Sequence, residues 1–406
     1  MIRILPKNLI AQIQQKGKKN LSEVKDILDQ NATSVVSFSA PQYSSLAFKI
    51  KNAITFPFNK EIHSLARFSD YLDFNIIGFY DSKYAGQIGR TVMSIIGNNL
   101  HGNDLLIQNI DTIDWESNFD TIILGHVTEL SQVCGKDYET EIIKKCKVYN
   151  KQIYSLRDIR THELIGDNKV KFYCPYIDQP TGPIINKMYS IGKPVLGVVG
   201  TSSRQGKFSL QIELKHEFKA LGYNVGYLGT EPTSLLYGID AVFPMGYESA
   251  VYTKGLSSVY AVNHLMGSIE KKQPDIIMFG SQSHTIPKYT GGLQHYPVVQ
   301  HELLLGCQAD AYILCISAED SVEYIRRTIS YLEGIYPSKV IALALSPLEN
   351  TLRWSVLSHK KKLISKEVEI MTLEKMREAF NMPVYSWNDY NQLKELAENC
   401  ISYFSD

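Results

Sequence analysis

Residues 195–209 read VLGVVGTSSRQGKFS, an apolar segment that runs into a glycine-containing loop. The segment 195–199 has the length and composition of a buried strand, and the residues after the loop carry apolar side chains at helical spacing over 208–221. A strand, a glycine loop and a helix in this order bring several backbone N–H groups and the positive end of the helix dipole to one point. The sequence therefore predicts a phosphate-binding loop that opens an α/β domain.

The residues of this loop are the predicted cofactor-binding residues. Gly200 and Gly206 permit unusual backbone angles, and Lys207 can reach a terminal phosphate, so we also assign Lys207 a catalytic role. Five residues separate the two glycines where the strict pattern has four, and Phe208 stands where Ser or Thr normally contacts Mg²⁺. The residues assigned to cofactor binding are Gly200, Thr201, Ser202, Ser203, Arg204, Gln205, Gly206, Lys207, Phe208 and Ser209.

Apolar runs of strand length alternate with amphipathic stretches along most of the chain, which is typical of an α/β fold with parallel sheets. A proline-rich segment at 176–194 marks a boundary. We predict an N-terminal extension over 1–70 that packs on the first domain, a Rossmann-like domain over 71–185 and a P-loop NTPase-like domain over 186–406. Other predicted strands are 34–38, 75–80, 121–125, 152–156, 225–228, 276–279, 311–316 and 340–345, and predicted helices in the first half are 88–96 and 138–149.

Composition narrows the class of protein. The 406 residues contain 42 Lys and Arg against 42 Asp and Glu, and this balance argues against a general nucleic-acid surface. No apolar stretch approaches the length of a membrane span, and the start lacks the core of a signal peptide. The cysteines form no CxxC pair, and Cys307 and Cys315 are predicted to be buried thiols. We expect a cytoplasmic homo-oligomer with a small-molecule substrate, no nucleic-acid or membrane partner and no metal site.

A second group of candidate residues follows the predicted strand at 276–279. The segment after this strand is polar and rich in glycine, and α/β proteins bind ligands outside the carboxyl ends of their strands. His284 is the histidine nearest to that strand end, and we assign it as a general base, with a solvated or capping histidine as the alternative. The predicted substrate-binding residues are Asp240, Ser281, Gln282, Ser283 and Tyr289.

These motifs together resemble the D-glutamate N-acetyltransferase-like proteins, formerly a bacterial domain of unknown function. The match starts near residue 70. The shared motifs are Gly200-Thr201 with Gly206-Lys207 and Ser209, followed by the segments 238–242, 287–291 and 381–384. The resemblance implies a Rossmann-like domain followed by a P-loop domain, with acetyl-CoA or another acyl-CoA as cofactor. Ser202 and Met245 stand where the family has acids, and 279–283 replaces the family's Glu-Gly-Gln-Gly-Ser.

Three functions fit this pattern. The resemblance implies an acyl-CoA-dependent N-acyltransferase for an amino acid or similar small amine, with Arg204 as a partner for the acceptor's charge. Acyl transfer needs a base and oxyanion donors but no metal. The second function is an ATP-dependent kinase or ligase that uses Mg²⁺ to activate a carboxylate. The strand at 276–279 ends without an acid, although Glu231, Asp240 and Glu248 remain as substitutes. The third is a non-catalytic nucleotide- or metabolite-binding protein, and we rank the acyltransferase first.

Overall fold

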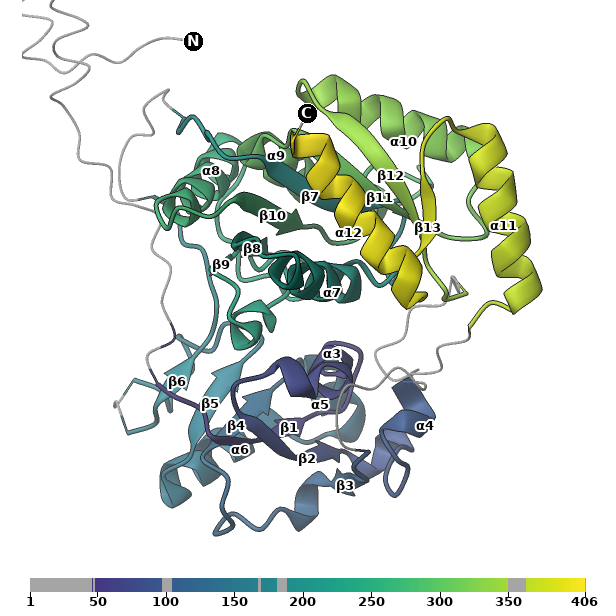
Figure 1. Cartoon of the computed structure of the whole chain (residues 1–406). Coiled ribbons are helices and arrows are strands. Elements are labelled where there is room, and N and C mark those ends of the chain that lie inside the picture. Colours follow the sequence, from purple (N-terminus) through teal and green to yellow (C-terminus); the bar gives the residue numbers. More distant parts are fainter. Residues whose placement is uncertain are drawn as a thin grey trace, which may run out of the picture. The chain divides into compact units, whose positions relative to one another are not determined.

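The computed structural model describes residues 46, 48–96, 104–166, 169–180, 188–349 and 363–405, all of which lie in one compact unit. Two parallel sheets with helices packed on them make up this part of the chain (Figure 1). The architecture confirms the predicted α/β class, a Rossmann-like domain followed by a P-loop domain. The strand predicted at 34–38 lies outside the described residues, as does most of the predicted N-terminal extension.

The first sheet has the strand order β3-β2-β1-β4-β5-β6, and its neighbouring strands are parallel. This order is that of dinucleotide-binding Rossmann domains, in which the chain changes direction between the first and fourth strands. Ligands bind at this switch point, outside the carboxyl ends of the two strands. The strands are β1 (Asn52–Phe56), β2 (Asn75–Asp81), β3 (Ile107–Asn109), β4 (Thr121–Leu124), β5 (Gln152–Ser155) and β6 (Phe172–Tyr173), and the helices are α3 (His63–Arg67), α4 (Met93–Ile96), α5 (Thr128–Cys134) and α6 (Tyr138–Tyr149).

Strand β1 differs from the sequence-based division of the chain. It lies in a stretch that the sequence analysis placed in the N-terminal extension, yet it pairs with β2 on one side and β4 on the other. Four of its five residues are buried, as expected for a central strand. A five-residue strand between Lys51 and Pro57 is too short to show a clear periodicity, which explains why the sequence pattern missed it. The remaining domain bounds stay predictions.

The helix predicted at 88–96 begins only at Met93, where α4 starts. Residues 89–92 instead lie beside residues 105–107. The N–H of Gly89 donates to the carbonyl of Ile107, and the N–H of Val92 donates to the carbonyl of Leu105. These contacts use backbone groups that a helix would need, and Gly89 has φ +80°, outside the helical region. The helix predicted at 138–149 is confirmed as α6.

The second sheet has the order β13-β12-β11-β7-β10-β8-β9, and its strands are also parallel. The predicted strands of this half are confirmed to within one residue at each end. Its strands are β7 (Val195–Gly200), β8 (Val225–Gly229), β9 (Ala241–Val242), β10 (Ile276–Gly280), β11 (Ala311–Ile316), β12 (Lys339–Leu345) and β13 (Val384–Ser386), and its helices are α7 (Lys207–Ala220), α8 (Leu256–Glu270), α9 (Val298–Cys307), α10 (Val322–Ile335), α11 (Lys366–Ala379) and α12 (Tyr390–Ser405).

Both faces of the second sheet are buried, because successive residues of each strand point to opposite sides. Leu196 and Val198 of β7 pack in the apolar cluster that contains α7 and α12, which lie side by side in Figure 1. Val195 and Val199 pack in the cluster that contains α8, α9, α10 and α11. Cys307 and Cys315 are buried, as predicted. Within the described ranges, no helix is both long enough and apolar enough to cross a bilayer.

Candidate functional site

One cavity collects residues that follow the carboxyl ends of strands from both sheets. In the first sheet these strands are β1 and β4, the pair at the switch point, so the cavity occupies the position where such folds bind ligands. In the second sheet they are chiefly β7, β8 and β10. The lining residues after these five strands are Lys60, Glu61, His63, Ser64 and Arg67 (β1), His126 (β4), 203–209 (β7), 231–233 (β8) and 281–283 (β10), and the lining is completed by Met245 and Tyr247 after β9 and Leu348 after β12.

Each glycine of the predicted phosphate loop stands at a position where a larger side chain would not fit. Gly206 has φ +72°, in the left-handed region, and a Cβ there would lie 2.2 Å from the ring of Trp387. Gly200 has ordinary backbone angles, but a Cβ there would meet the side-chain oxygen of Gln205 at 2.5 Å. Helix α7 begins directly after Gly206, so the positive end of its dipole lies at the cavity. The predicted strand–loop–helix arrangement is therefore present.

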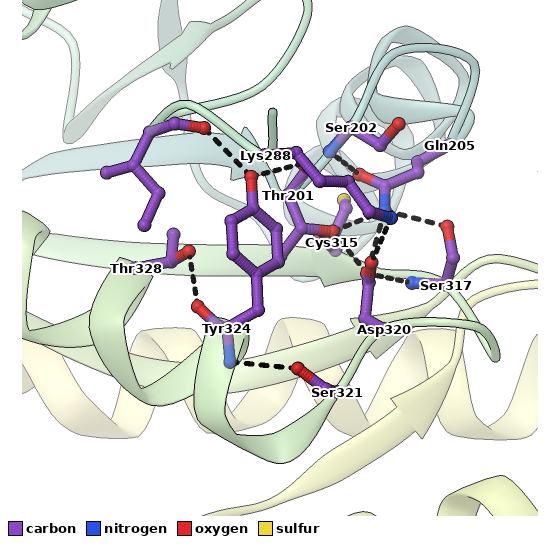
Figure 2. A network of polar contacts seen from close by, with 11 residues as sticks. Thr201, Ser202, Gln205, Lys288, Cys315, Ser317, Asp320, Ser321, Tyr324 and Thr328 are labelled. Carbon is purple, nitrogen blue, oxygen red and sulfur yellow. Dashed lines mark hydrogen bonds and ion pairs between the residues drawn. The ribbon is translucent and has the colours of Figure 1, made fainter. Parts of the chain in front are cut away.

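A buried carboxylate on the neighbouring strand end holds the loop in place. The side chain of Asp320, which follows β11, is inaccessible to solvent. It accepts a hydrogen bond from the hydroxyl of Thr201 at 2.5 Å and from the N–H of Ser317 at 2.8 Å, and its other oxygen pairs with Lys288 at 2.8 Å (Figure 2). Sequence reasoning did not single out Asp320, although a polar residue after a buried strand was the signal that led to 281–283.

The side chain of Gln205 completes this network from within the loop. Its amide nitrogen donates to the hydroxyls of Thr201 at 2.6 Å and Ser317 at 2.8 Å, and its oxygen accepts from the N–H of Ser202 at 3.0 Å. The same nitrogen lies 3.5 Å from Asp320, and Figure 2 shows Gln205 beside Thr201, Ser317 and Asp320. Thr201 is buried beneath the loop and does not line the cavity. Gly200, Thr201 and Ser202 thus support the loop, whereas residues 203–209 face the cavity.

Lys207 is the first buried cation of the cavity. Its ammonium group donates to the carbonyls of Ser202 at 2.6 Å and Ser283 at 2.9 Å, and the residue is only 6% exposed. Burial lowers the pKa of Lys207 to about 8, although Cys315 and Glu231 act in the opposite direction. Among the residues that the structure describes, no carboxylate forms an ion pair with it. A buried ammonium paired only with carbonyls leaves a net positive charge.

Arg67 is the second buried cation, and it comes from helix α3 of the first domain. Its guanidinium donates to the hydroxyl of Ser209 at 3.2 Å and to the carbonyl of Ile96 at 3.3 Å. Burial lowers the pKa of Arg67, and Tyr237 and Glu213 offset this only in part. In the described part of the chain Arg67, like Lys207, has no carboxylate in ion-pair contact. Two such cations at one cavity favour an anionic ligand with more than one charge.

Two carboxylates also reach the cavity. Burial raises the pKa of Glu231 to about 8, and the neighbouring Glu61 raises it further, while Lys60 and Lys207 act in the opposite direction. Glu61 itself pairs with Lys60 at 2.9 Å. At neutral pH Glu231 is therefore mainly protonated and does not cancel the charge of Lys207. The described residues contain no group of three or more His, Cys, Asp or Glu side chains that could hold a metal ion.

The shifted pKa values of Lys207 and Glu231 predict how the affinity of the cavity for an anion depends on pH. Between pH 7 and pH 9 Lys207 loses its positive charge and Glu231 gains a negative charge, because both have a pKa of about 8. Both changes oppose an anion, so the affinity for sulfate, whose charge is constant over this range, is expected to fall roughly tenfold or more. Calorimetric titration at the two pH values measures this. A Lys207→Ala variant is expected to show a weaker dependence, and an affinity that rises with pH would contradict the assignment.

The other predicted residues divide into two groups. Ser281, Gln282 and Ser283 line the cavity, and the amide of Gln282 donates to the carbonyl of Thr230 at 2.8 Å. Tyr289 is 62% exposed and is absent from the lining. Asp240 is also absent from the lining. Its carboxylate accepts a hydrogen bond from the N–H of Tyr227 and forms an ion pair with Lys272, each at 2.8 Å. Substrate contacts by these residues stay predictions.

The predicted general base, His284, does not line the cavity. Its Nε2 lies 2.6 Å from the carbonyl oxygen of His295, so this nitrogen carries a hydrogen and donates it. Burial lowers the pKa of His284, and the contact with His295 opposes this. The histidine that does line the cavity with a carboxylate beside it is His126, and sequence reasoning did not identify it.

Three solved structures are similar to this chain over part of its length. The crystal structure of a DUF1611 family protein from Anabaena variabilis aligns with 87% of this chain and 100% of its own, at 14% identity and a TM-score of 0.59. A plasmid partition protein from Borrelia burgdorferi aligns with 52% of this chain and 97% of its own, at 13% identity and a TM-score of 0.34. Cobyrinic acid a,c-diamide synthase from Mycobacterium smegmatis, solved with ADP and magnesium, aligns with 53% and 96%, at 12% identity and a TM-score of 0.33.

A search of curated proteins finds no match. The family model described as the P-loop domain of DUF1611, a domain of unknown function, matches residues 186–389, which is half of the chain. These residues hold the sheet from β7 to β13 and the phosphate loop. On this match, the chain belongs to the DUF1611 family.

Proposed function

We propose that this protein is an acyl-CoA-dependent N-acyltransferase that acts on an amino acid or a similar small amine. This is the activity implied by its resemblance to the D-glutamate N-acetyltransferase-like proteins. The observation that carries the proposal is the pair of buried cations, Lys207 and Arg67, at the start of α7. Together with the N-terminal end of the helix they fit the linked phosphates of a donor such as CoA.

The contact between Arg67 and Ser209 favours acyl-CoA over Mg-ATP. In Mg²⁺-dependent P-loop enzymes a hydroxyl directly after the loop lysine contacts the metal. Here that position is Phe208, and the nearby hydroxyl of Ser209 accepts a hydrogen bond from a guanidinium. The guanidinium of Arg67 thus places a positive charge of the protein beside the hydroxyl of Ser209. The phosphates of CoA can be held by such charges, and acyl transfer requires no metal.

The size and lining of the cavity agree with a donor and a small acceptor. Its volume is about 210 Å³, below the range of roughly 300–1,000 Å³ for pockets that enclose a whole drug-sized ligand. The cavity would therefore hold part of the donor, with the rest outside. Arg204 lines it and is a candidate partner for the carboxylate of an amino acid.

Titration calorimetry and a thiol-release assay test the proposal. Acetyl-CoA is expected to bind equally well with EDTA and with Mg²⁺, and thiol release is expected with at least one member of a panel of L- and D-amino acids. An Arg67→Met variant is expected to bind acetyl-CoA about tenfold or more weakly, because one charge-assisted contact is lost. Tight binding of Mg-ATP that EDTA abolishes, without binding of acetyl-CoA, would overturn the proposal.

A second candidate is an ATP-dependent kinase or ligase. Glu61 and Glu231 favour it, since carboxylates beside a P-loop lysine are the oxygen ligands that Mg²⁺ prefers. In that case Glu231→Gln is expected to weaken the Mg²⁺-dependent binding of ATP, because the metal loses an oxygen ligand; an acyltransferase binds acetyl-CoA without Mg²⁺ in both forms. Binding of acetyl-CoA with no turnover of any amine would support the third reading, a non-catalytic metabolite-binding protein.

A further inference from the structure

His126 lies at the switch point of the first sheet, two residues after β4, and lines the cavity. It is 4% exposed, and its Nδ1 lies 2.9 Å from a carboxylate oxygen of Glu248, which follows β9 of the second sheet. A carboxylate can only accept, so Nδ1 carries a hydrogen, and in the neutral form of the ring Nε2 has a free lone pair. Within the described part of the chain, no hydrogen bond to Nε2 is found.

Glu248 is held in its ionised form. Burial alone would raise its pKa, but hydrogen bonds from His126 and Thr128 and the charge of Arg157 outweigh burial, and the pKa of Glu248 is lowered. The guanidinium of Arg157 lies 3.8 Å from the carboxylate and also pairs with Glu139 at 2.9 Å. A carboxylate anchored on one side can orient an imidazole on the other.

The imidazole is also fixed by packing. The ring of Tyr247 meets it edge to face, with centroids 5.2 Å apart, and the hydroxyl of Tyr247 donates to Glu129 at 2.8 Å. Glu248 has φ +48°, an uncommon conformation for a residue other than glycine. The loop after β9 thus adopts a costly backbone geometry at the residue that meets His126. Such an arrangement is common where a side chain must be positioned for chemistry.

We propose that His126 is the general base of this site and that Glu248 is its positioning residue. The assignment rests on the proposed acyl transfer. The neutral Nε2 takes a proton from the acceptor nitrogen while this nitrogen forms a bond to the acyl carbonyl carbon. The carbon–sulfur bond of the thioester breaks, and the proton passes from Nε2 to the sulfur. An acceptor that enters as an ammonium ion releases one further proton to solvent, so that amide, thiol and one proton are the products.

Three variants test this assignment. His126→Gln is expected to lower kcat for thiol release about 100- to 10,000-fold, with the dissociation constant for acetyl-CoA within about twofold of wild type. Glu248→Gln is expected to lower kcat roughly tenfold or more, and Glu248→Asp is expected to restore part of it, which a purely structural role would not predict. His162→Gln is the matched control, because both ring nitrogens of His162 are occupied by Thr140 and Leu164.

A spectroscopic readout separates the two proposals. Imidazole ¹⁵N chemical shifts report which ring nitrogen carries the hydrogen, so the neutral ring of His126 is expected to carry it on Nδ1 and to lose this preference in Glu248→Gln. Wild-type kcat in His126→Gln, or a neutral His126 with its hydrogen on Nε2, would overturn the general base and leave acyl transfer standing. A wild-type protein that neither binds acetyl-CoA nor releases thiol would overturn the acyl transfer, and with it the base. A neutral His126 with its hydrogen on Nδ1 in that protein would still show that the pairing of His126 with Glu248 is correct.

Discussion

An Asp320→Ala variant is expected to lose about 2–5 kcal/mol of unfolding free energy, because it leaves buried donors without an acceptor. Three groups lose their acceptor: the hydroxyl of Thr201, the N–H of Ser317 and the ammonium group of Lys288. Thr201 and Ser317 are buried, so water cannot easily replace the carboxylate there, whereas the side chain of Lys288 is 36% exposed and reaches water. Urea unfolding followed by circular dichroism measures the loss.

The control for this experiment is Asp240→Ala. Asp240 also accepts from a backbone N–H and pairs with a lysine, Lys272, but its side chain is 21% exposed and it lies outside the loop network. Its removal is expected to cost about 1 kcal/mol. Adding Lys288→Met to Asp320→Ala is expected to change the stability little further, since the exposed ammonium of Lys288 is solvated once its partner is removed. Equal losses in the two single variants would show that the buried network does not hold the loop.

A Lys207→Ala variant is expected to bind acetyl-CoA or sulfate about 30- to 150-fold more weakly, the effect of losing a charged hydrogen bond worth roughly 2–3 kcal/mol. The reason is that Lys207 is one of two buried cations that face the cavity with no carboxylate in ion-pair contact among the described residues. Calorimetry at pH 7, where the ammonium is mainly charged, measures the change.

The matched control is Lys215→Ala. Lys215 lies on the same helix, and its ammonium likewise donates to two carbonyls, those of Tyr237 and Gly238, each at 3.0 Å. It does not line the cavity, so its removal is expected to leave ligand affinity unchanged even if stability falls. Unchanged affinity in Lys207→Ala would overturn the assignment of the phosphate loop itself.

Local sequence patterns predicted most of the second domain. The strands at 276–279 and 311–316 were recognisable because buried parallel strands are continuous apolar runs, and the structure confirms both. The patterns failed where tertiary contacts override local preference. Residues 89–92 pair with 105–107 in place of forming a helix, and β1 is identified as central only by its neighbours β2 and β4.

The residues of the candidate site also divide into those that local sequence predicted and those that depend on tertiary contacts. Lys207 and residues 281–283 were predicted, because each directly follows a recognisable strand or loop. Arg67 and His126 were missed, because each lies in the first domain, and its importance depends on a partner far along the chain. His284 was chosen because it is the histidine nearest the end of the strand at 276–279, and His126, which also follows a strand, was not considered. What distinguishes them is the partner: a carbonyl for His284 and a carboxylate for His126.

A phosphate loop on an α/β domain can be recognised from the amino-acid sequence of this chain, because its strand, glycine loop and helix follow one another directly at 195–221. The residues that surround this loop could be identified only from the three-dimensional structure. Arg67 meets Ser209 across 142 residues of sequence, and His126 meets Glu248 across 122. Contacts between residues so far apart in the sequence form when whole sheets pack together. They produce no periodic pattern of residues in the sequence from which they could be predicted. The charges that meet at the candidate site are therefore set by the tertiary fold.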